Sequence, residues 1–138
     1  MNIASFGASS QIAKGLIKKF IKHSKNQLIF FVRDKKTFKA WLNKQTIPIN
    51  ASDILFYSEF SVDAKIDIII NCIGVGDPAK AISISSSIQS TTKYFDEIAL
   101  AYLESNPKTK YFFLSSGIAY GDIFSSPARS YSQQNIDL

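Results

Sequence analysis

The sequence predicts an α/β fold, a doubly wound parallel sheet of about five strands with helices on both faces. Two observations predict it. Strand and helix patterns alternate from the start of the chain, and strands joined by helices run parallel. The expected strands are also short runs of Ile, Phe, Tyr or Val without strict polar alternation, so we expect both faces of every strand to be buried. The expected strand order is 3-2-1-4-5.

The elements follow one another in a regular order. The expected strands are Asn2–Phe6, Leu28–Val32, Ile54–Tyr57, Asp67–Asn71 and Lys110–Leu114. The expected helices are Ser10–Ser24, Lys35–Lys44 and Ile84–Glu104. Serines suited to capping open the first helix, and Lys22, His23 and Lys25 near its end suit the negative end of the helix dipole. The start of the third helix is ambiguous, because Ile82 and Ile84 also alternate as in a strand.

Length and composition indicate one domain over residues 1–138, since 138 residues with 46% hydrophobic content suffice for a single core. No apolar run is long enough to span a membrane, and no secretory signal is present, so we expect a soluble cytoplasmic protein. Cys72 is the only cysteine and His23 the only histidine, so we expect no metal site and no internal disulfide.

The net charge of +5 is concentrated near the N-terminus, where Asp34 is the only acid among residues 1–50. The lysines of the first helix fall opposite its apolar positions, as in a solvated helix face. No aromatic residues alternate with these lysines, so we expect no nucleic acid partner. The charge would still attract an anionic cofactor.

The turn after the first strand is the strongest functional signal. The residues there are Gly7, Ala8, Ser9, Ser10, Gln11 and Ile12. Free backbone N–H groups at a helix N-terminus favour an anion, and small side chains let a diphosphate approach the backbone. Taken alone, this pattern is equally consistent with a turn that contains glycine for structural reasons.

Other strand ends add candidates at the same edge of the sheet. Arg33 follows the second strand, where its planar guanidinium would bind a ribose phosphate, although it also fits an ordinary solvated arginine. Asn71, Cys72, Ile73 and Gly74 end the fourth strand. Ser115 and Ser116 end the fifth, and their hydroxyls would either face a ligand crevice or simply terminate the strand.

These pieces together resemble the short-chain dehydrogenase/reductase superfamily, most closely its extended branch of NAD(P)-dependent nucleotide-sugar epimerases and dehydratases, which have a Rossmann fold. Gly7, Ser10 and Ala13 stand at the glycines of the Gly-x-x-Gly-x-x-Gly pattern of that family. The stretch 71–74 resembles its Asn-Ala-Ala-Gly segment. The most specific match is the Ser-Ser-x-x-x-Tyr-Gly segment, made here by Ser115, Ser116, Tyr120 and Gly121.

The resemblance implies roles for these residues. Ser116 would be the catalytic hydroxyl that binds the substrate oxygen, and residues 7–12 would hold the cofactor diphosphate. Arg33 would select NADP over NAD, and Glu59 would lie near the adenine. Cys72, Ile73, Gly74 and Ser115 would complete the cofactor site. The resemblance also implies a sugar-like substrate and allows a homodimer formed through the Ile84–Glu104 helix.

The Tyr-x-x-x-Lys motif of the superfamily is absent from the sequence. We therefore expect the chain to be the N-terminal cofactor-binding portion of a longer oxidoreductase, with a natural truncation as the other account of the missing motif. The alternative is a dinucleotide-binding redox sensor or regulatory protein without catalytic activity. A third reading, an unrelated nucleotide-binding module, is disfavoured by the serine pair and by the lack of a P-loop.

Overall fold

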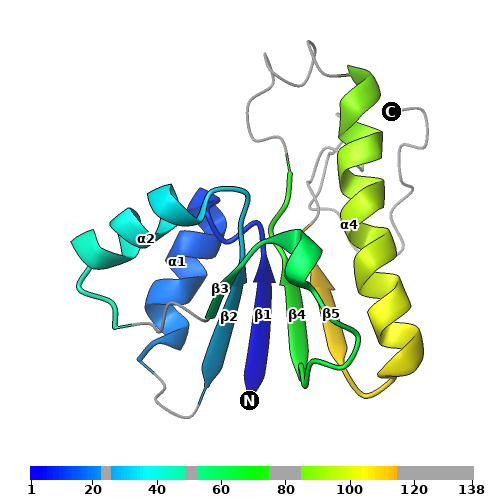
Figure 1. The fold of residues 1–138 in the computed structure, drawn as a ribbon, viewed down its shortest axis with the longest axis horizontal. Helices are drawn as coiled ribbons and strands as arrows, with labels where there is room; N and C mark the ends of the chain where they lie inside the picture. Colours follow the sequence, from blue (N-terminus) through cyan, green and yellow to red (C-terminus); the bar gives the residue numbers. More distant parts are fainter. Residues whose placement is uncertain (23–25, 49–52, 75–84, 115–138) are drawn as a thin grey trace, which may run out of the picture.

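The computed structural model describes residues 1–22, 26–48, 53–74 and 85–114, which contain a five-stranded parallel sheet in the order β3-β2-β1-β4-β5 (Figure 1). The predicted α/β class and strand order are therefore confirmed. In chain order the elements are β1 (Asn2–Phe6), α1 (Gln11–Phe20), β2 (Gln27–Phe31), α2 (Lys35–Lys44), β3 (Ile54–Leu55), the 3-10 helix η2 (Tyr57–Glu59), β4 (Ile68–Asn71), α4 (Ser85–Ser105) and β5 (Lys110–Phe113).

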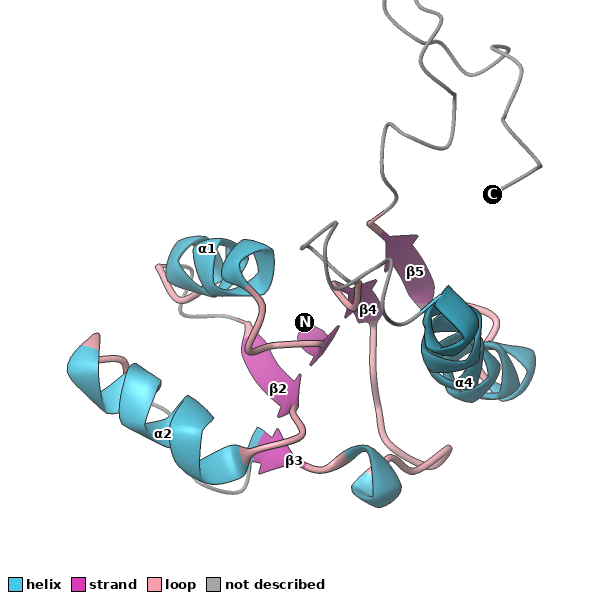
Figure 2. Ribbon diagram, turned by 90° about the horizontal axis from the view of Figure 1, so that it is seen from above, coloured by secondary structure: helices cyan, strands magenta, loops and turns pink. Residues whose placement is uncertain are grey.

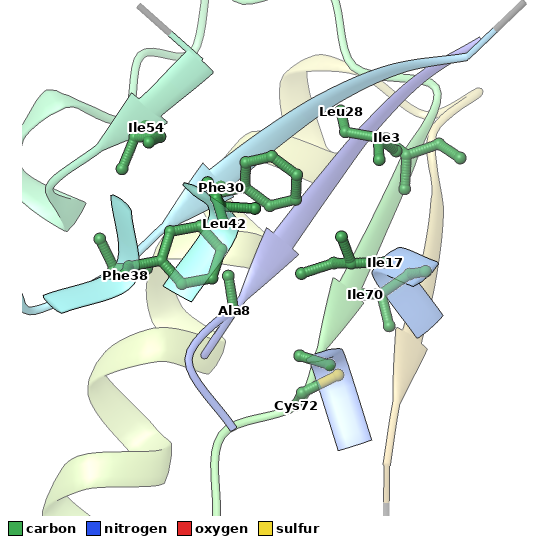
Figure 3. Packing of buried hydrophobic residues seen from close by; sticks show 12 residues of the cluster. Ile3, Ala8, Ile17, Leu28, Phe30, Phe38, Leu42, Ile54, Ile70 and Cys72 are labelled. Atoms are coloured by element: carbon green, nitrogen blue, oxygen red, sulfur yellow. The ribbon is translucent and has the colours of Figure 1, made fainter. Parts of the chain in front are cut away.

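Helices cover both faces of the sheet, with α1 and α2 on one face and α4 on the other (Figure 2). Because side chains alternate along a strand, each face has its own apolar core. On the first face Ile17 of α1 and Phe38 of α2 pack with Ile3, Phe30 and other strand residues (Figure 3). This packing fixes the two helices that follow the phosphate-binding candidates.

The second core is rich in aromatic rings and lies between the sheet, η2 and α4. The ring centroids of Phe6 and Phe31 are 5.3 Å apart, and that of Phe60 lies 5.3 Å from Phe6. Tyr102 of α4 is buried, and its hydroxyl donates to the carbonyl of Ala64. These contacts cover the sheet on the side where the short segment between β3 and β4 runs.

Several boundaries differ from the predictions. The first helix ends at Phe20 rather than Ser24, and residues 23–25 are not among the residues that the structure describes. The second strand lies one residue earlier than expected, at Gln27–Phe31. The third strand ends at Leu55 rather than Tyr57, and Glu59 is the last residue of the 3-10 helix η2, four residues after the end of the strand. The remaining elements match within one residue.

The prediction that every strand is buried on both faces is wrong for β5. Phe112 is 52% exposed and Phe113 is 46% exposed. In the described part of the chain β5 pairs with β4 alone, so it is an edge strand and lacks the second neighbour that covers the central strands.

None of the helices in the described segments combines the length and the apolar character that a membrane span needs.

Candidate functional site

The turns after β1, β2 and β4 meet at the carboxyl edge of the sheet, since parallel strands end on the same side (Figure 1). β1 lies between β2 and β4, so the turn that begins at Gly7 is flanked by the turn at Arg33 and the turn at Cys72. The predicted cofactor residues in these three turns are therefore neighbours in space.

Gly7 makes the turn after β1 possible. Its φ is +68°, a left-handed conformation that favours glycine, and a Cβ there would lie 3.0 Å from the backbone C and O of Cys72. The same Cβ would lie 3.0 Å from Cγ1 of Ile73. The turn after β1 is thus packed directly against the turn after β4.

Ser10 starts α1 as its N-cap. Its side chain accepts the N–H of Ala13 at 3.2 Å, and its own N–H donates to the Gly7 carbonyl at 2.9 Å. The buried Ala8 donates its N–H to the carbonyl of Phe31 on β2 at 3.4 Å. The turn is thereby tied to β2 and to the first turn of α1.

Three backbone N–H groups in this turn have no acceptor among the described residues. They belong to Ser9, Gln11 and Ile12, whose side chains are exposed. Such groups at the positive end of a helix bind anions, and small neighbours leave room for a phosphate. The residues present therefore fit the diphosphate of a dinucleotide.

Arg33 and Asp34 follow β2, and they differ in their contacts: Asp34 is hydrogen-bonded to Thr37, whereas Arg33 is exposed. Asp34 is the N-cap of α2: its Oδ1 accepts the N–H of Thr37 at 3.0 Å, and its Oδ2 accepts the Thr37 hydroxyl at 2.6 Å. The hydrogen bonds from the Thr37 side chain and backbone hold the pKa of the Asp34 carboxyl below its ordinary value. The Arg33 side chain is exposed and makes no ion pair with any acid in the described segments.

Glu59 is engaged within the protein. Its Oε2 lies 2.6 Å from Nζ of Lys35, and the same oxygen accepts the N–H of Phe56 at 2.6 Å. The Lys35 hydrogen bond, followed by that from Phe56, lowers the pKa of the Glu59 carboxyl. The Lys35 ammonium also lies 4.3 Å from the centre of the Phe56 ring. Glu59 thus joins the first residue of α2 to the segment after β3.

Asn71 holds the turn after β4. It is 1% exposed, and its Oδ1 accepts the N–H of Ile73 at 2.9 Å. Its Nδ2 donates to the Tyr111 hydroxyl and to Oδ1 of Asp96. Burial raises the pKa of the neighbouring Cys72 thiol, which keeps this side chain neutral. Asp96 and Tyr111 were not predicted for the site, because one reads as a solvated helix position and the other as a strand position.

Tyr57 is a third residue that sequence reasoning missed. Its hydroxyl accepts the N–H of Gly7 at 2.7 Å across 50 positions of sequence. No local pattern signals a contact between the segment after β3 and the turn after β1. The aromatic character of Tyr57 was the only available cue, and it pointed to core packing.

The remaining predicted residues are placed as follows. Gly74 is exposed at the end of the turn after β4, with open space around it. Ser115 and Ser116 lie outside the described residues.

No group of three or more His, Cys, Asp or Glu side chains that would hold a metal occurs in the part of the chain that the structure describes. An open depression of about 420 Å³ beside Lys65, Asn106 and Lys108 contains none of the predicted site residues.

Comparison with known proteins adds one match. A family model described as the NAD dependent epimerase/dehydratase family matches residues 6–136. A comparison with curated proteins gives no match. The matched range begins at the end of β1 and includes all three turns at the carboxyl edge of the sheet.

Proposed function

Because the chain belongs to the NAD dependent epimerase/dehydratase family, we propose that it binds NADP across the carboxyl edge of its sheet and serves oxidoreductase chemistry on a sugar-like substrate. The family is NAD(P)-dependent, so the choice of NADP and the sugar-like substrate are the specific parts of this proposal. A nucleotide sugar is the substrate class we favour, and the cytoplasm the compartment.

The observation that carries the proposal is the turn at Gly7. Its positive φ and close approach to Cys72 bring the chain sharply from β1 into α1. The N–H groups of Ser9, Gln11 and Ile12 are left without acceptors in the described segments. A diphosphate supplies the acceptors that these groups lack.

The preference for NADP rests on the side chains after β2. A carboxylate at this position would favour the free hydroxyls of the NAD ribose, but both oxygens of Asp34 accept hydrogen bonds from Thr37. Lys35 is paired with Glu59. Arg33 is exposed and makes no ion pair among the described residues, and its planar guanidinium suits a ribose phosphate better than the point charge of the nearby Lys36.

Bound NADP would supply a hydride acceptor or donor. The residues of the turn at Gly7 would hold its diphosphate, and Arg33 would hold the ribose phosphate. Ser116, through the family resemblance, would orient the substrate oxygen. The sensor alternative needs the same dinucleotide site, so the first experiment tests what both functions share.

The experiment is a titration of the 138-residue chain with NADPH and, separately, with NADH, followed by nicotinamide fluorescence. We expect saturable binding of NADPH and weaker binding of NADH. Replacement of Gly7 provides the control, because it disrupts the proposed diphosphate site. Absence of saturable binding of either dinucleotide to the folded chain would refute the proposal.

A further inference from the structure

Tyr57 lies against the proposed phosphate-binding turn with its hydroxyl directed at the backbone. The hydroxyl oxygen accepts the N–H of Gly7 at 2.7 Å. A tyrosine hydroxyl can also donate one hydrogen, and no acceptor for it occurs among the described residues. Tyr57 therefore leaves one donor available at Gly7, the first residue of the turn in which the Ser9, Gln11 and Ile12 N–H groups have no acceptor among the described residues.

We propose that Tyr57 is a further ligand of the cofactor diphosphate, its hydroxyl donating a hydrogen bond to a phosphate oxygen held in the turn after β1. This inference rests on the proposed function. It adds a ligand from the segment after β3 to a diphosphate site that the sequence pattern places only in the turn after β1. The Gly7 N–H donates to Tyr57 and so cannot donate to the diphosphate. The tyrosine hydroxyl would donate to the diphosphate in its place.

The tyrosine ring is fixed by aromatic neighbours from three elements. Its centroid lies 5.7 Å from Phe6 of β1, 6.1 Å from Phe31 of β2 and 4.4 Å from Phe95 of α4. Held in this way, the ring has little freedom, and the hydroxyl hydrogen moves mainly by rotation about the C–O bond. A donor fixed before the ligand arrives loses little conformational entropy on binding.

The charge state suits a donor. Burial raises the pKa of Tyr57, so the hydroxyl keeps its hydrogen at neutral pH. The hydrogen bond from Gly7 and the positive charge of Arg33 oppose this shift. The hydrogen bond from Gly7 also polarises the hydroxyl, and a hydroxyl that accepts one hydrogen bond donates a stronger second one.

The first test compares the binding of NADPH to the wild-type chain, to Tyr57→Phe and to Tyr102→Phe. Tyr102→Phe is the matched control, because it also removes a buried, hydrogen-bonded hydroxyl, but beside Ala64 and Ile66 and away from Gly7. We expect Tyr57→Phe to weaken binding about tenfold or more, the usual effect of losing a hydrogen bond to a charged group. Tyr102→Phe should bind as the wild type does.

A second measurement separates direct contact from a purely structural role and does not require Tyr57→Phe to fold. With 3-fluorotyrosine introduced at position 57 alone, the fluorine resonance should shift on addition of ADP and remain unchanged with adenosine. Equal shifts with the two ligands, or equal NADPH affinity of Tyr57→Phe and the wild type, would overturn the inference. If the wild type binds no dinucleotide at all, the proposed function itself fails.

Discussion

The hydroxyl of Tyr111 on β5 donates a hydrogen bond to Oδ1 of Asp96 on α4 at a distance of 2.6 Å. The Nδ2 group of Asn71 completes the cluster, 2.9 Å from the Tyr111 hydroxyl and 3.3 Å from the same Asp96 oxygen. Three elements are therefore joined at the carboxyl end of β4. Because the other side of the Asn71 amide accepts the Ile73 N–H, this cluster fixes the turn that packs against Gly7.

Replacing Asn71 with aspartate should destabilise the protein in a pH-dependent way. The new carboxylate would lie beside Asp96, and two such carboxylates cannot both ionise without repulsion. One of them should have a folded-state pKa above its unfolded value, so the variant gains stability at low pH and loses it as pH rises through that folded pKa. We expect a loss of about 3 kcal/mol at pH 8 that shrinks toward pH 5.

Asn71→Leu is the matched control for this prediction. It removes the same hydrogen bonds without adding charge, so its loss of stability should be nearly independent of pH between 5 and 8. Urea unfolding of both variants at the two pH values supplies the comparison. Parallel pH profiles for the two variants would contradict the predicted repulsion between carboxylates at positions 71 and 96.

Tyr111 should ionise at unusually high pH. Burial, and then the hydrogen bond to Asp96, raise the pKa of Tyr111 to about 12. Since the folded-state value exceeds the unfolded value of about 10, the stabilisation from this group is complete below pH about 10 and disappears as pH rises through about 12. The difference in phenolate absorbance between the wild type and Tyr111→Phe measures the midpoint. A midpoint near that of a free tyrosine would show that the hydroxyl is solvated.

Gly7→Ala should both destabilise the chain and abolish dinucleotide binding. The left-handed backbone of Gly7 and the 3.0 Å approach of a Cβ to Cys72 together predict a loss of about 1–3 kcal/mol. Gly15→Ala is the control, because a Cβ at Gly15 of α1 meets no atom within 4 Å. That change should stabilise the helix by about 0.5–1 kcal/mol. Thermal unfolding checks both, and a neutral Gly7→Ala would exclude the tight turn.

Arg33→Ala should reduce the preference for NADPH over NADH. Loss of the guanidinium should weaken NADPH by about 1–3 kcal/mol, while NADH, which lacks the ribose phosphate, should bind nearly unchanged. Lys39→Ala removes one positive charge from exposed α2 and should have little effect on either cofactor. Isothermal titration with both cofactors provides the measurement. Equal affinity of the wild type for the two cofactors would show that Arg33 does not select between them.

Much of the fold was accessible from local sequence. Asn2–Phe6 and Lys35–Lys44 were predicted with the boundaries that the structure has, because each pattern is bounded by a clear turn or cap. The exposure of β5 was not predictable from its own residues. The strand is as rich in aromatic residues as a central strand, and the exposure of Phe112 depends on which elements lie next to β5.

In the candidate site, too, residues in local sequence patterns were predicted, whereas residues brought there by long-range contacts were not. The turn at Gly7 is a local pattern and was predicted, and its cofactor role stays a prediction, as does the role of Ser116. Tyr57, Asp96 and Tyr111 reach this region through contacts between residues far apart in sequence. Asp34 shows the opposite limit: it stands at the right position for a ribose ligand, but the hydroxyl of Thr37 three residues later engages its carboxylate.

The central place of β1 determines the order in which a nascent chain can complete its sheet. Asn2 pairs with Gln27 on one side, whereas Ile3 pairs with Ile68 on the other. On the ribosome, β1, β2 and β3 therefore all emerge before β4, which begins 13 residues after the end of β3. During that interval one backbone edge of β1 is open to water and to other chains. The speed with which β4 closes that edge should govern how much newly made protein escapes aggregation.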